Sequence, residues 1–175
     1  MIVQGRVWKL GDNVDTDQLL PGRYLSLTDP AELAAHCLED LLPGFSQKVR
    51  PGDILVAGEN LGCGSSREHA PLALKGLGIS CLVARSYARI FFRNVINLGL
   101  PALTSPEAAA GLEQGDEVRI DLHTGQLENL SRPFRCSVPV LPGFLSEIID
   151  AGGMTAYVRH KVQARRVEPV GKEEG

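Results

Sequence analysis

The segment at residues 58–71, which reads GENLGCGSSREHAP, constrains this chain more strongly than any other part of its sequence. It contains three glycines, two adjacent serines, an arginine, two glutamates and a histidine. The apolar run before it, at 53–57, is rich in strand-forming residues, and the segment after it, at 72–77, has helical composition and is followed by glycine. The pattern therefore predicts a junction at which a strand leads through a turn into a helix.

The serine pair in this segment has the position and chemistry of a helix start. Ser65 or Ser66 is a good N-cap, and Pro71 is tolerated in a first helical turn. We therefore expect 65–69 to form the N-terminus of the helix. Free backbone N–H groups and the positive end of the helix dipole would then lie within reach of Arg67 and both serines, which predicts a site for an anion.

Structural explanations compete with this functional interpretation. Glycine-rich turns between strands and helices are common, and a serine pair is more often a cap than a catalyst, so the spacing alone leaves both open. Two familiar motifs are excluded. No lysine follows Gly64, as a phosphate-binding P-loop requires, and 64–68 lacks the second glycine of a nucleophile elbow.

The segment resembles the GSSREH signature of the aconitase superfamily, in particular that of the separate small subunits of the isopropylmalate dehydratases and their relatives. Two further stretches agree in order and position, GDNVDTDQLLP at 11–21 and ARSYARIFFRN at 84–94, and the resemblance extends to about Leu103. It implies an α/β fold, with a mixed sheet flanked by helices in a single swivelling β/β/α domain of the aconitase type. Such a domain closes on a large subunit.

Length and composition fit one ordinary domain. The 175 residues suffice for a sizeable core, and we expect a domain over 1–166 followed by a charged, frayed tail over 167–175. The net charge of -3 argues against binding to nucleic acid through bulk electrostatics. No run is long enough to span a membrane and no signal peptide precedes the first expected strand, so we expect no membrane association and a cytoplasmic location.

The four cysteines, Cys37, Cys63, Cys81 and Cys136, are scattered without a CxxC pattern or a cluster with histidine. We therefore expect no metal ligated by this chain, and any iron-sulfur cluster must come from a partner. The apolar surroundings of Cys37 and Cys81 predict buried packing residues. Cys63 lies inside the central segment, where a small loop filler is the simpler interpretation and chemical modification the alternative.

Three aspartates fall within six residues at 12–17, a spacing that invites comparison with a metal site. The stretch lacks the glycine and the closing glutamate of a calcium loop, so capping of backbone N–H groups is the favoured interpretation and a direct ligand role the alternative. The resemblance places this stretch beside the active site, where Asp15, Thr16 and Asp17 would orient other groups.

The resemblance also implies that the loop at 21–28 covers the active site and contacts the variable side chain of the substrate. In homoaconitase relatives an arginine of this loop recognises an additional carboxylate, whereas Ser26 occupies that place here. Leu25 and Leu27 would suit an apolar substituent, or they pack in the core. Arg23 is either an anion partner or an ordinary surface arginine.

The remaining pattern predicts a conventional set of elements. Expected strands are 2–8, 79–84, 117–122 and 126–130, and expected helices are 29–42, 87–98, 106–111, 142–150 and 155–165. The helix at 87–98 carries an apolar stripe that predicts core packing. Arg85, Arg89 and Arg93 lie off that stripe, where solvated charges are favoured and a partner surface is the alternative.

The chemistry implied by the resemblance is that of a hydro-lyase, which eliminates water from a small hydroxy acid with two or three carboxylates and adds it back. A 4Fe-4S cluster bound by the large subunit acts on the leaving hydroxyl. The resemblance implies that the first serine of the signature, here Ser65, is the base that removes a proton from the neighbouring carbon. Glu68 and His69 are expected to orient other groups.

A serine alkoxide is costly at neutral pH, so the segment has to stabilise negative charge. The helix N-terminus, loop N–H groups made accessible by Gly62 and Gly64, and the cation of Arg67 all favour it. Arg67 is also expected to grip a substrate carboxylate in a bidentate fork, with a hydrogen bond from Ser66.

The resemblance favours the branch that interconverts 2-isopropylmalate and 3-isopropylmalate through isopropylmaleate in leucine biosynthesis. Small subunits of homoaconitase and of methylmalate or dimethylmalate dehydratases share the same motifs and are close alternatives. A regulatory or RNA-binding module is the alternative outside enzymology. The intact GSSREH segment and the weak negative charge favour the enzyme.

Overall fold

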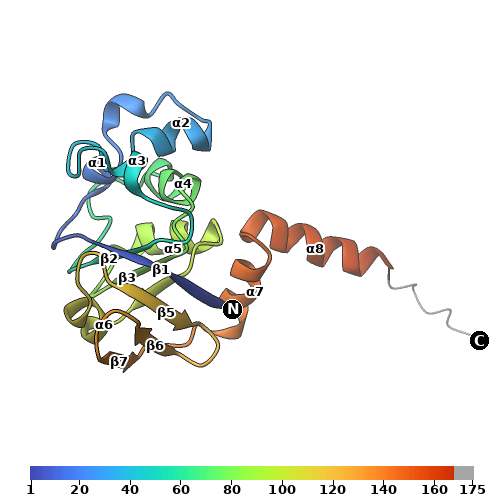
Figure 1. Ribbon diagram of the computed structural model, residues 1–175. Coiled ribbons are helices and arrows are strands. Elements are labelled where there is room, and N and C mark those ends of the chain that lie inside the picture. The colour runs from blue at the N-terminus through green and yellow to red at the C-terminus, as the bar shows by residue number, and fades with distance from the viewer. Residues whose placement is uncertain (168–175) are drawn as a thin grey trace, which may run out of the picture.

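The computed structural model describes residues 1–167, which fold around a seven-stranded mixed sheet (Figure 1). The strand order is β4-β3-β2-β1-β5-β6-β7. The strands are β1 Ile2–Lys9, β2 Ile54–Ala57, β3 Cys81–Ala84, β4 Ala102–Thr104, β5 Glu117–Asp121, β6 Gln126–Asn129 and β7 Phe134–Ser137. The helices are α1 Thr16–Leu19, the 3-10 turn η1 Gly22–Tyr24, α2 Pro30–Ala35, α3 Phe45–Lys48, α4 His69–Gly76, α5 Arg89–Asn97, α6 Pro106–Gly111, α7 Gly143–Asp150 and α8 Met154–Val167.

The sheet has a parallel half and an antiparallel half, and β1 belongs to both. The first part of β1 pairs antiparallel with β5, from Ile2 opposite Asp121, and its last residues pair parallel with β2, from Val7 opposite Ile54. Strands β2 and β3 are buried along their whole length, which is typical of parallel strands covered on both faces. Helices α4 and α5 are the crossovers of this half, so the loops that follow β2 and β3 meet at the same edge of the sheet.

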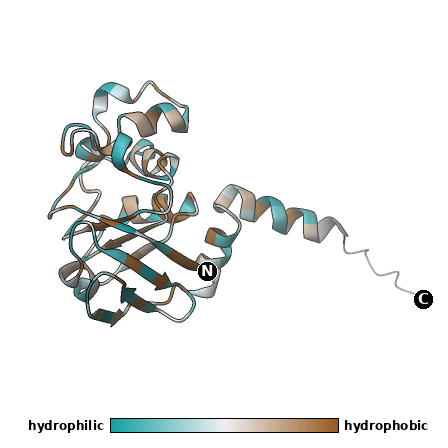
Figure 2. Cartoon of the chain, viewed as in Figure 1, coloured by the Kyte–Doolittle hydropathy of each residue, from teal (hydrophilic) through white to brown (hydrophobic). Residues whose placement is uncertain are grey.

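Hydrophobic residues gather on the strands in the middle of the molecule, whereas α8 alternates hydrophilic and hydrophobic residues (Figure 2). Figure 1 shows α8 projecting away from the sheet. Cys37 and Cys81 are fully buried in the core, as predicted, and their burial raises the pKa of both thiols. None of the helices in residues 1–167 combines the length and the apolar character needed to cross a membrane.

The predicted fold class is confirmed, and most predicted elements lie within a few residues of the observed ones. Strands β4 and β7 were not predicted. The predicted boundary between a domain over 1–166 and a tail over 167–175 stays a prediction, because α8 includes Val167 and residues 168–175 lie outside the part that the structure describes.

The helix expected over 29–42 is wrong in its second half, because α2 ends at Ala35. Leu38 has a left-handed backbone with a φ of 57°, and its N–H donates to the carbonyl of Leu19 at 2.8 Å. The Leu38 side chain is fully buried. The hydrogen bond from Leu38 to the last residue of α1, together with the burial of its side chain, therefore replaces the continued helix.

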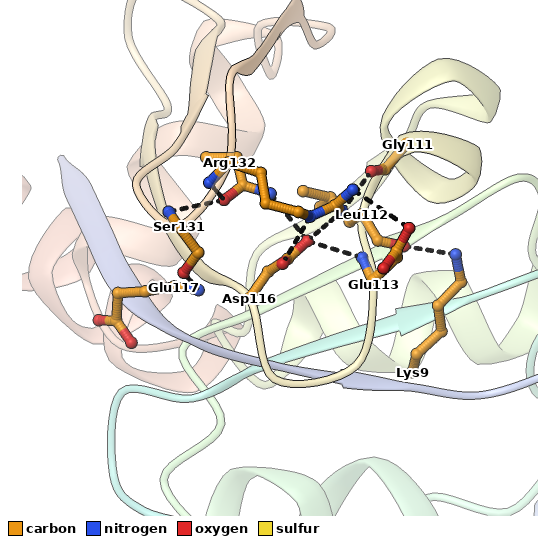
Figure 3. A network of polar contacts seen from close by, with 9 residues as sticks. Lys9, Gly111, Leu112, Glu113, Asp116, Glu117, Ser131 and Arg132 are labelled. Atoms are coloured by element: carbon orange, nitrogen blue, oxygen red, sulfur yellow. Dashed lines mark hydrogen bonds and ion pairs between the residues drawn. The ribbon is translucent and has the colours of Figure 1, made fainter.

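A buried carboxylate ties the antiparallel half of the sheet together (Figure 3). Asp116, which is only 6% exposed, accepts hydrogen bonds from Nε of Arg132 at 2.9 Å, from the side-chain amide of Asn129 at 2.7 Å and from the backbone N–H of Glu113 at 2.8 Å. Arg132 also donates to the carbonyl of Gly111. The Arg132 guanidinium, followed by the other donors, lowers the pKa of Asp116 to about 2.

Candidate functional site

Two chain segments, 62–67 and 88–94, form a cavity of about 230 Å³ together with Thr16 from α1. The first segment belongs to the loop between β2 and α4, and the second spans the start of α5. Its lining residues are Thr16, Gly62, Gly64, Ser65, Ser66, Arg67, Ala88, Arg89, Ile90, Phe91 and Asn94. The cavity thus lies at the edge of the sheet where the two crossover loops meet. A wider and more open depression lies over β6 and β7, away from every predicted site residue.

Ser65 is held against Thr16. The two hydroxyl oxygens lie 3.2 Å apart, and the Thr16 hydroxyl is also within 3.2 Å of the Ser65 carbonyl oxygen. Thr16 is almost completely buried, and its N–H donates to the carbonyl of Cys63 at 3.0 Å. The acidic stretch therefore lies directly beside the serine loop, and Thr16 positions Ser65.

Asp15 and Asp17 flank Thr16 and have different partners. The Asp15 carboxylate caps α1 by accepting from the N–H of Gln18 at 2.7 Å, and the Gln18 side chain accepts from the Asp15 N–H at 3.0 Å. This is the capping chemistry that the sequence favours. Asp17 forms an ion pair with Arg67. One nitrogen of the Arg67 fork is therefore engaged, and the guanidinium is fixed at the cavity wall.

The helix after the serines begins later than predicted. Helix α4 starts at His69 with Glu68 as its N-cap residue, and neither Ser65 nor Ser66 caps it. The N–H of Arg67 instead donates to the Ser65 carbonyl at 2.9 Å, which closes a local turn. The expectation that 65–69 form the start of the helix was wrong because this turn uses the backbone groups that a helix would need.

The helix N-terminus that lines the cavity is that of α5 and not that of α4. Helix α5 follows Ala88, whose side chain makes no capping hydrogen bond, and Ala88, Arg89 and Ile90 all line the cavity. The first N–H groups of a helix have no partner within it and carry the positive end of its dipole. Negative charge in the cavity is therefore favoured by α5, with Arg67 and Arg89 close by.

Gly62 allows the serine loop to pack directly on α5. Its φ is 78°, and a Cβ atom built at Gly62 would lie 2.0 Å from Cγ of Phe91. Gly64 also has a positive φ, of 89°, but a Cβ there would meet its nearest neighbours, Asp15 and Thr16, only at 3.6 Å. The two predicted glycines therefore serve different purposes: Gly62 for close approach and Gly64 for backbone conformation alone.

Only the start of the loop at 21–28 lies near the cavity. A Cβ atom at Gly22 would lie 3.4 Å from a guanidinium nitrogen of Arg67. Leu25, Ser26 and Leu27 do not line the cavity, and Leu27 packs against the core. Their contact with a substrate side chain therefore stays a prediction.

Arg23 is engaged by carboxylates of its own chain. Its two terminal nitrogens donate to the Asp40 carboxylate at 2.9 and 2.7 Å, and it also pairs with Glu39. The Asp40 carboxylate raises the pKa of the Arg23 guanidinium. Tyr24 stacks on His36, with ring centroids 3.7 Å apart, so the loop is anchored on the segment after α2.

Glu68 and His69 also lie outside the cavity lining. Sequence reasoning missed Arg89, Ile90 and Asn94 as cavity residues. The signal available was their place in the stretch 84–94, which shares its resemblance with the serine segment. Periodicity could only show that Arg89 lies off the apolar stripe of α5, and not which space it faces.

The described residues contain no group of three or more histidine, cysteine, aspartate or glutamate side chains that could hold a metal ion. Thiolates are the usual ligands of iron-sulfur clusters, and burial raises the pKa of the Cys37 and Cys81 thiols. These two cysteines do not fit as cluster ligands.

The mixed sheet and the serine and arginine cavity at its crossover edge define a domain of the aconitase type, and the family model described as the aconitase C-terminal domain matches residues 36–108. The chain is 53% identical over 163 residues to the 3-isopropylmalate dehydratase small subunit of Moorella thermoacetica, covering 93% of this chain and 98% of that protein. It belongs to the family of 3-isopropylmalate dehydratase small subunits.

Two further similarities come from Methanocaldococcus jannaschii. A protein named isopropylmalate/citramalate isomerase small subunit is 51% identical over 161 residues, covering 92% of this chain and 96% of that protein. A crystal structure described as 3-isopropylmalate dehydratase superposes with a TM-score of 0.88 at 43% identity, covering 95% of this chain and 99% of the other. The fold thus agrees with that of this crystal structure over nearly its whole length.

Proposed function

We propose that this chain is the small subunit of a 3-isopropylmalate dehydratase and supplies the base and the carboxylate-binding half of an active site shared with a large subunit. The observation that carries the proposal is the placement of Ser65 against Thr16 in a cavity lined by two arginines and the uncapped start of α5. The family membership supports the reaction, which is the interconversion of 2-isopropylmalate and 3-isopropylmalate through isopropylmaleate.

Ser65 is the proposed base. Its oxygen takes the proton from the carbon next to the one that carries the leaving hydroxyl, and returns a proton when water adds back. The negative charge on that oxygen is favoured by the dipole of α5 and by the cations of Arg67 and Arg89. Thr16 can donate its hydroxyl hydrogen to the Ser65 oxygen across 3.2 Å, which stabilises the charged form further.

Arg67 and Ser66 are the proposed ligands of one substrate carboxylate. Because Asp17 holds one nitrogen of Arg67, the rest of the guanidinium is oriented for a carboxylate that enters the cavity. Gly22 lies beside this pair, so the start of the loop at 21–28 is close to the proposed carboxylate site. Leu25 and Leu27 remain the proposed contacts of an apolar substituent.

The partner and its cofactor follow from the family. We infer a large subunit that holds a 4Fe-4S cluster, because the relatives are named as small subunits and the buried thiols of Cys37 and Cys81 do not fit as cluster ligands. Such a cluster supplies a Lewis acid for the departing hydroxyl when it is bound. The cytoplasmic location expected from the sequence stays a prediction.

Citramalate is the second candidate substrate, because the relative named isopropylmalate/citramalate isomerase small subunit is 51% identical to this chain. Both substrates carry an apolar substituent and two carboxylates. Ser26 provides no cation for a third carboxylate, so homoaconitate is a weaker candidate.

Replacing Ser65 by alanine in the complex reconstituted with its large subunit tests the proposal. Loss of the base should lower kcat at least about a thousandfold, with subunit assembly unchanged by size-exclusion chromatography. Ser66→Ala is the matched control, since it removes the same hydroxyl from the neighbouring position and should act mainly by raising KM. Substantial turnover by the Ser65→Ala complex would refute the assignment of the base.

A further inference from the structure

Asn94 is a buried polar residue whose side chain has no partner within the described protein. It lies in the second turn of α5, is 9% exposed and lines the cavity. Its side-chain amide makes no hydrogen bond to any other residue within 1–167, although its backbone carbonyl accepts from Leu98. Among residues 1–167, the only fully buried side-chain nitrogen or oxygen without a partner is Nε of Arg6, so the Asn94 amide keeps contact with the space of the cavity. The Asn94 amide is therefore free to hydrogen-bond to a molecule that enters the cavity.

Arg89 presents a second unpaired donor to the same space. It is the first residue of α5, is exposed and lines the cavity, and it forms no ion pair with another residue of the described chain. Arg67, by contrast, is already paired with Asp17. The start of α5 adds backbone N–H groups without a side-chain cap.

The balance of charge in the cavity points to an anion. Its lining includes two arginines, three hydroxyl side chains and an amide, but no carboxylate. Guanidinium, amide and helix N–H groups are all donors, and a carboxylate, the anionic group of the proposed substrate, accepts from several donors at once. A substrate with two carboxylates needs a second anchoring point besides Arg67 and Ser66.

We propose that Asn94, Arg89 and the N-terminus of α5 form a second carboxylate subsite, which binds the other carboxylate of the dicarboxylate substrate. The inference rests on the proposed function, because it assigns the two ends of the same substrate to the two segments that line the cavity. Asn94 donates from its amide, Arg89 pairs with the charge, and the helix dipole favours it. Ser65 then faces the carbon between the two anchored ends.

The test uses the complex reconstituted with its large subunit and three variants of this chain. Asn94→Leu keeps the size of the side chain and removes the donor, and should raise KM for isopropylmalate about tenfold, with kcat within about threefold of wild type. Asn94→Asp keeps the shape and adds a negative charge, and should raise KM about a hundredfold. Arg89→Gln should raise KM at least about tenfold.

Arg93→Gln is the matched control, because Arg93 is an exposed arginine of the same helix that does not line the cavity. It should leave KM unchanged. A purely structural role for Asn94 predicts that leucine is at least as harmful as aspartate and that kcat and melting temperature fall with it. That order, or an unchanged KM in the Arg89→Gln complex, would overturn the subsite.

Binding to a complex that also carries Ser65→Ala separates this inference from the assignment of the base. Calorimetric titration with isopropylmalate should show the same weakening by Asn94→Asp, about a hundredfold in Kd, without turnover. If the Ser65→Ala complex converts isopropylmalate at the normal rate, the base assignment fails, and the binding measurements still test the subsite. If Asn94→Asp binds like wild type, the subsite fails while the base assignment stands.

Discussion

At the scale of single residues, the contact between Gly62 and Phe91 fixes the distance between the two segments of the cavity. Gly62→Ala should destabilise the protein by about 3 kcal/mol, because a methyl group overlaps the Phe91 ring and the backbone has a positive φ. Gly64→Ala has the same backbone penalty without the overlap, and should cost about 1 kcal/mol. Urea unfolding followed by circular dichroism measures both losses, and equal losses would contradict a role for close packing at Gly62.

The sequence could predict that the residues of the serine segment share one site, because this combination of residue types is uncommon. The cavity does contain Ser65, Ser66 and Arg67 together. The ion pair between Asp17 and Arg67 could not be predicted, because it joins residues fifty positions apart and depends on how two loops cross. Asn94 was missed for a related reason: one asparagine on a helix gives no sequence signal of what it faces.

At the scale of the elements, the helix N-terminus that lies beside the serines belongs to a different helix from the one predicted. The sequence predicts a helix start at the serines, whereas α4 begins at His69 and α5 provides the uncapped start beside Ser65. The two helices follow neighbouring parallel strands, so their N-termini lie at one edge of the sheet. Which of them faces the serine loop depends on tertiary packing, and no local pattern encodes it.

The network around Asp116 joins the start of β5 to the turn after β6, and it predicts a pH dependence of stability. The pKa of Asp116 is about 2 in the folded chain, against about 3.9 in an unfolded chain. Its contribution is therefore complete above about pH 4 and is lost as pH falls through the interval from about 4 to about 2.

The Asp116→Asn variant, measured at several pH values, tests whether the charge of Asp116 stabilises the folded protein. The variant should be less stable than wild type by about 2 kcal/mol at pH 7, and the difference should shrink as the pH falls below about 4. Urea denaturation at pH 7, 4 and 3 gives the free energies of unfolding. A difference that stayed constant over this range would mean that the charge of Asp116 does not carry the stabilisation.

Short elements were the least predictable. β4 has only three residues, which is too few for alternation to be recognised. The hairpin of β5 and β6 was predicted correctly, because turn residues separate two alternating runs. Arg23 ties the loop at 21–28 to Glu39 and Asp40, and these two ion pairs could not be predicted because they depend on how the chain packs.

At the scale of the whole molecule, the mixed sheet explains how the loops that carry the proposed site residues come together. The parallel half places two crossover loops at one edge, and the antiparallel half extends the core on the other side of β1. The fold class was predictable from the resemblance together with the strand and helix pattern. The cavity carries the proposed base and anion donors, and the proposed large subunit contributes the cluster.

The most direct test of this account is turnover by the chain reconstituted with its large subunit under anaerobic conditions. Isopropylmalate, citramalate, homoaconitate and dimethylmaleate are assayed in parallel, and ultraviolet absorbance reports the unsaturated acid that is formed or consumed. The proposed function predicts the highest kcat/KM for isopropylmalate, with homoaconitate disfavoured because Ser26 provides no cation. No turnover of any of these acids by an assembled, cluster-loaded complex would contradict the account and favour a regulatory module.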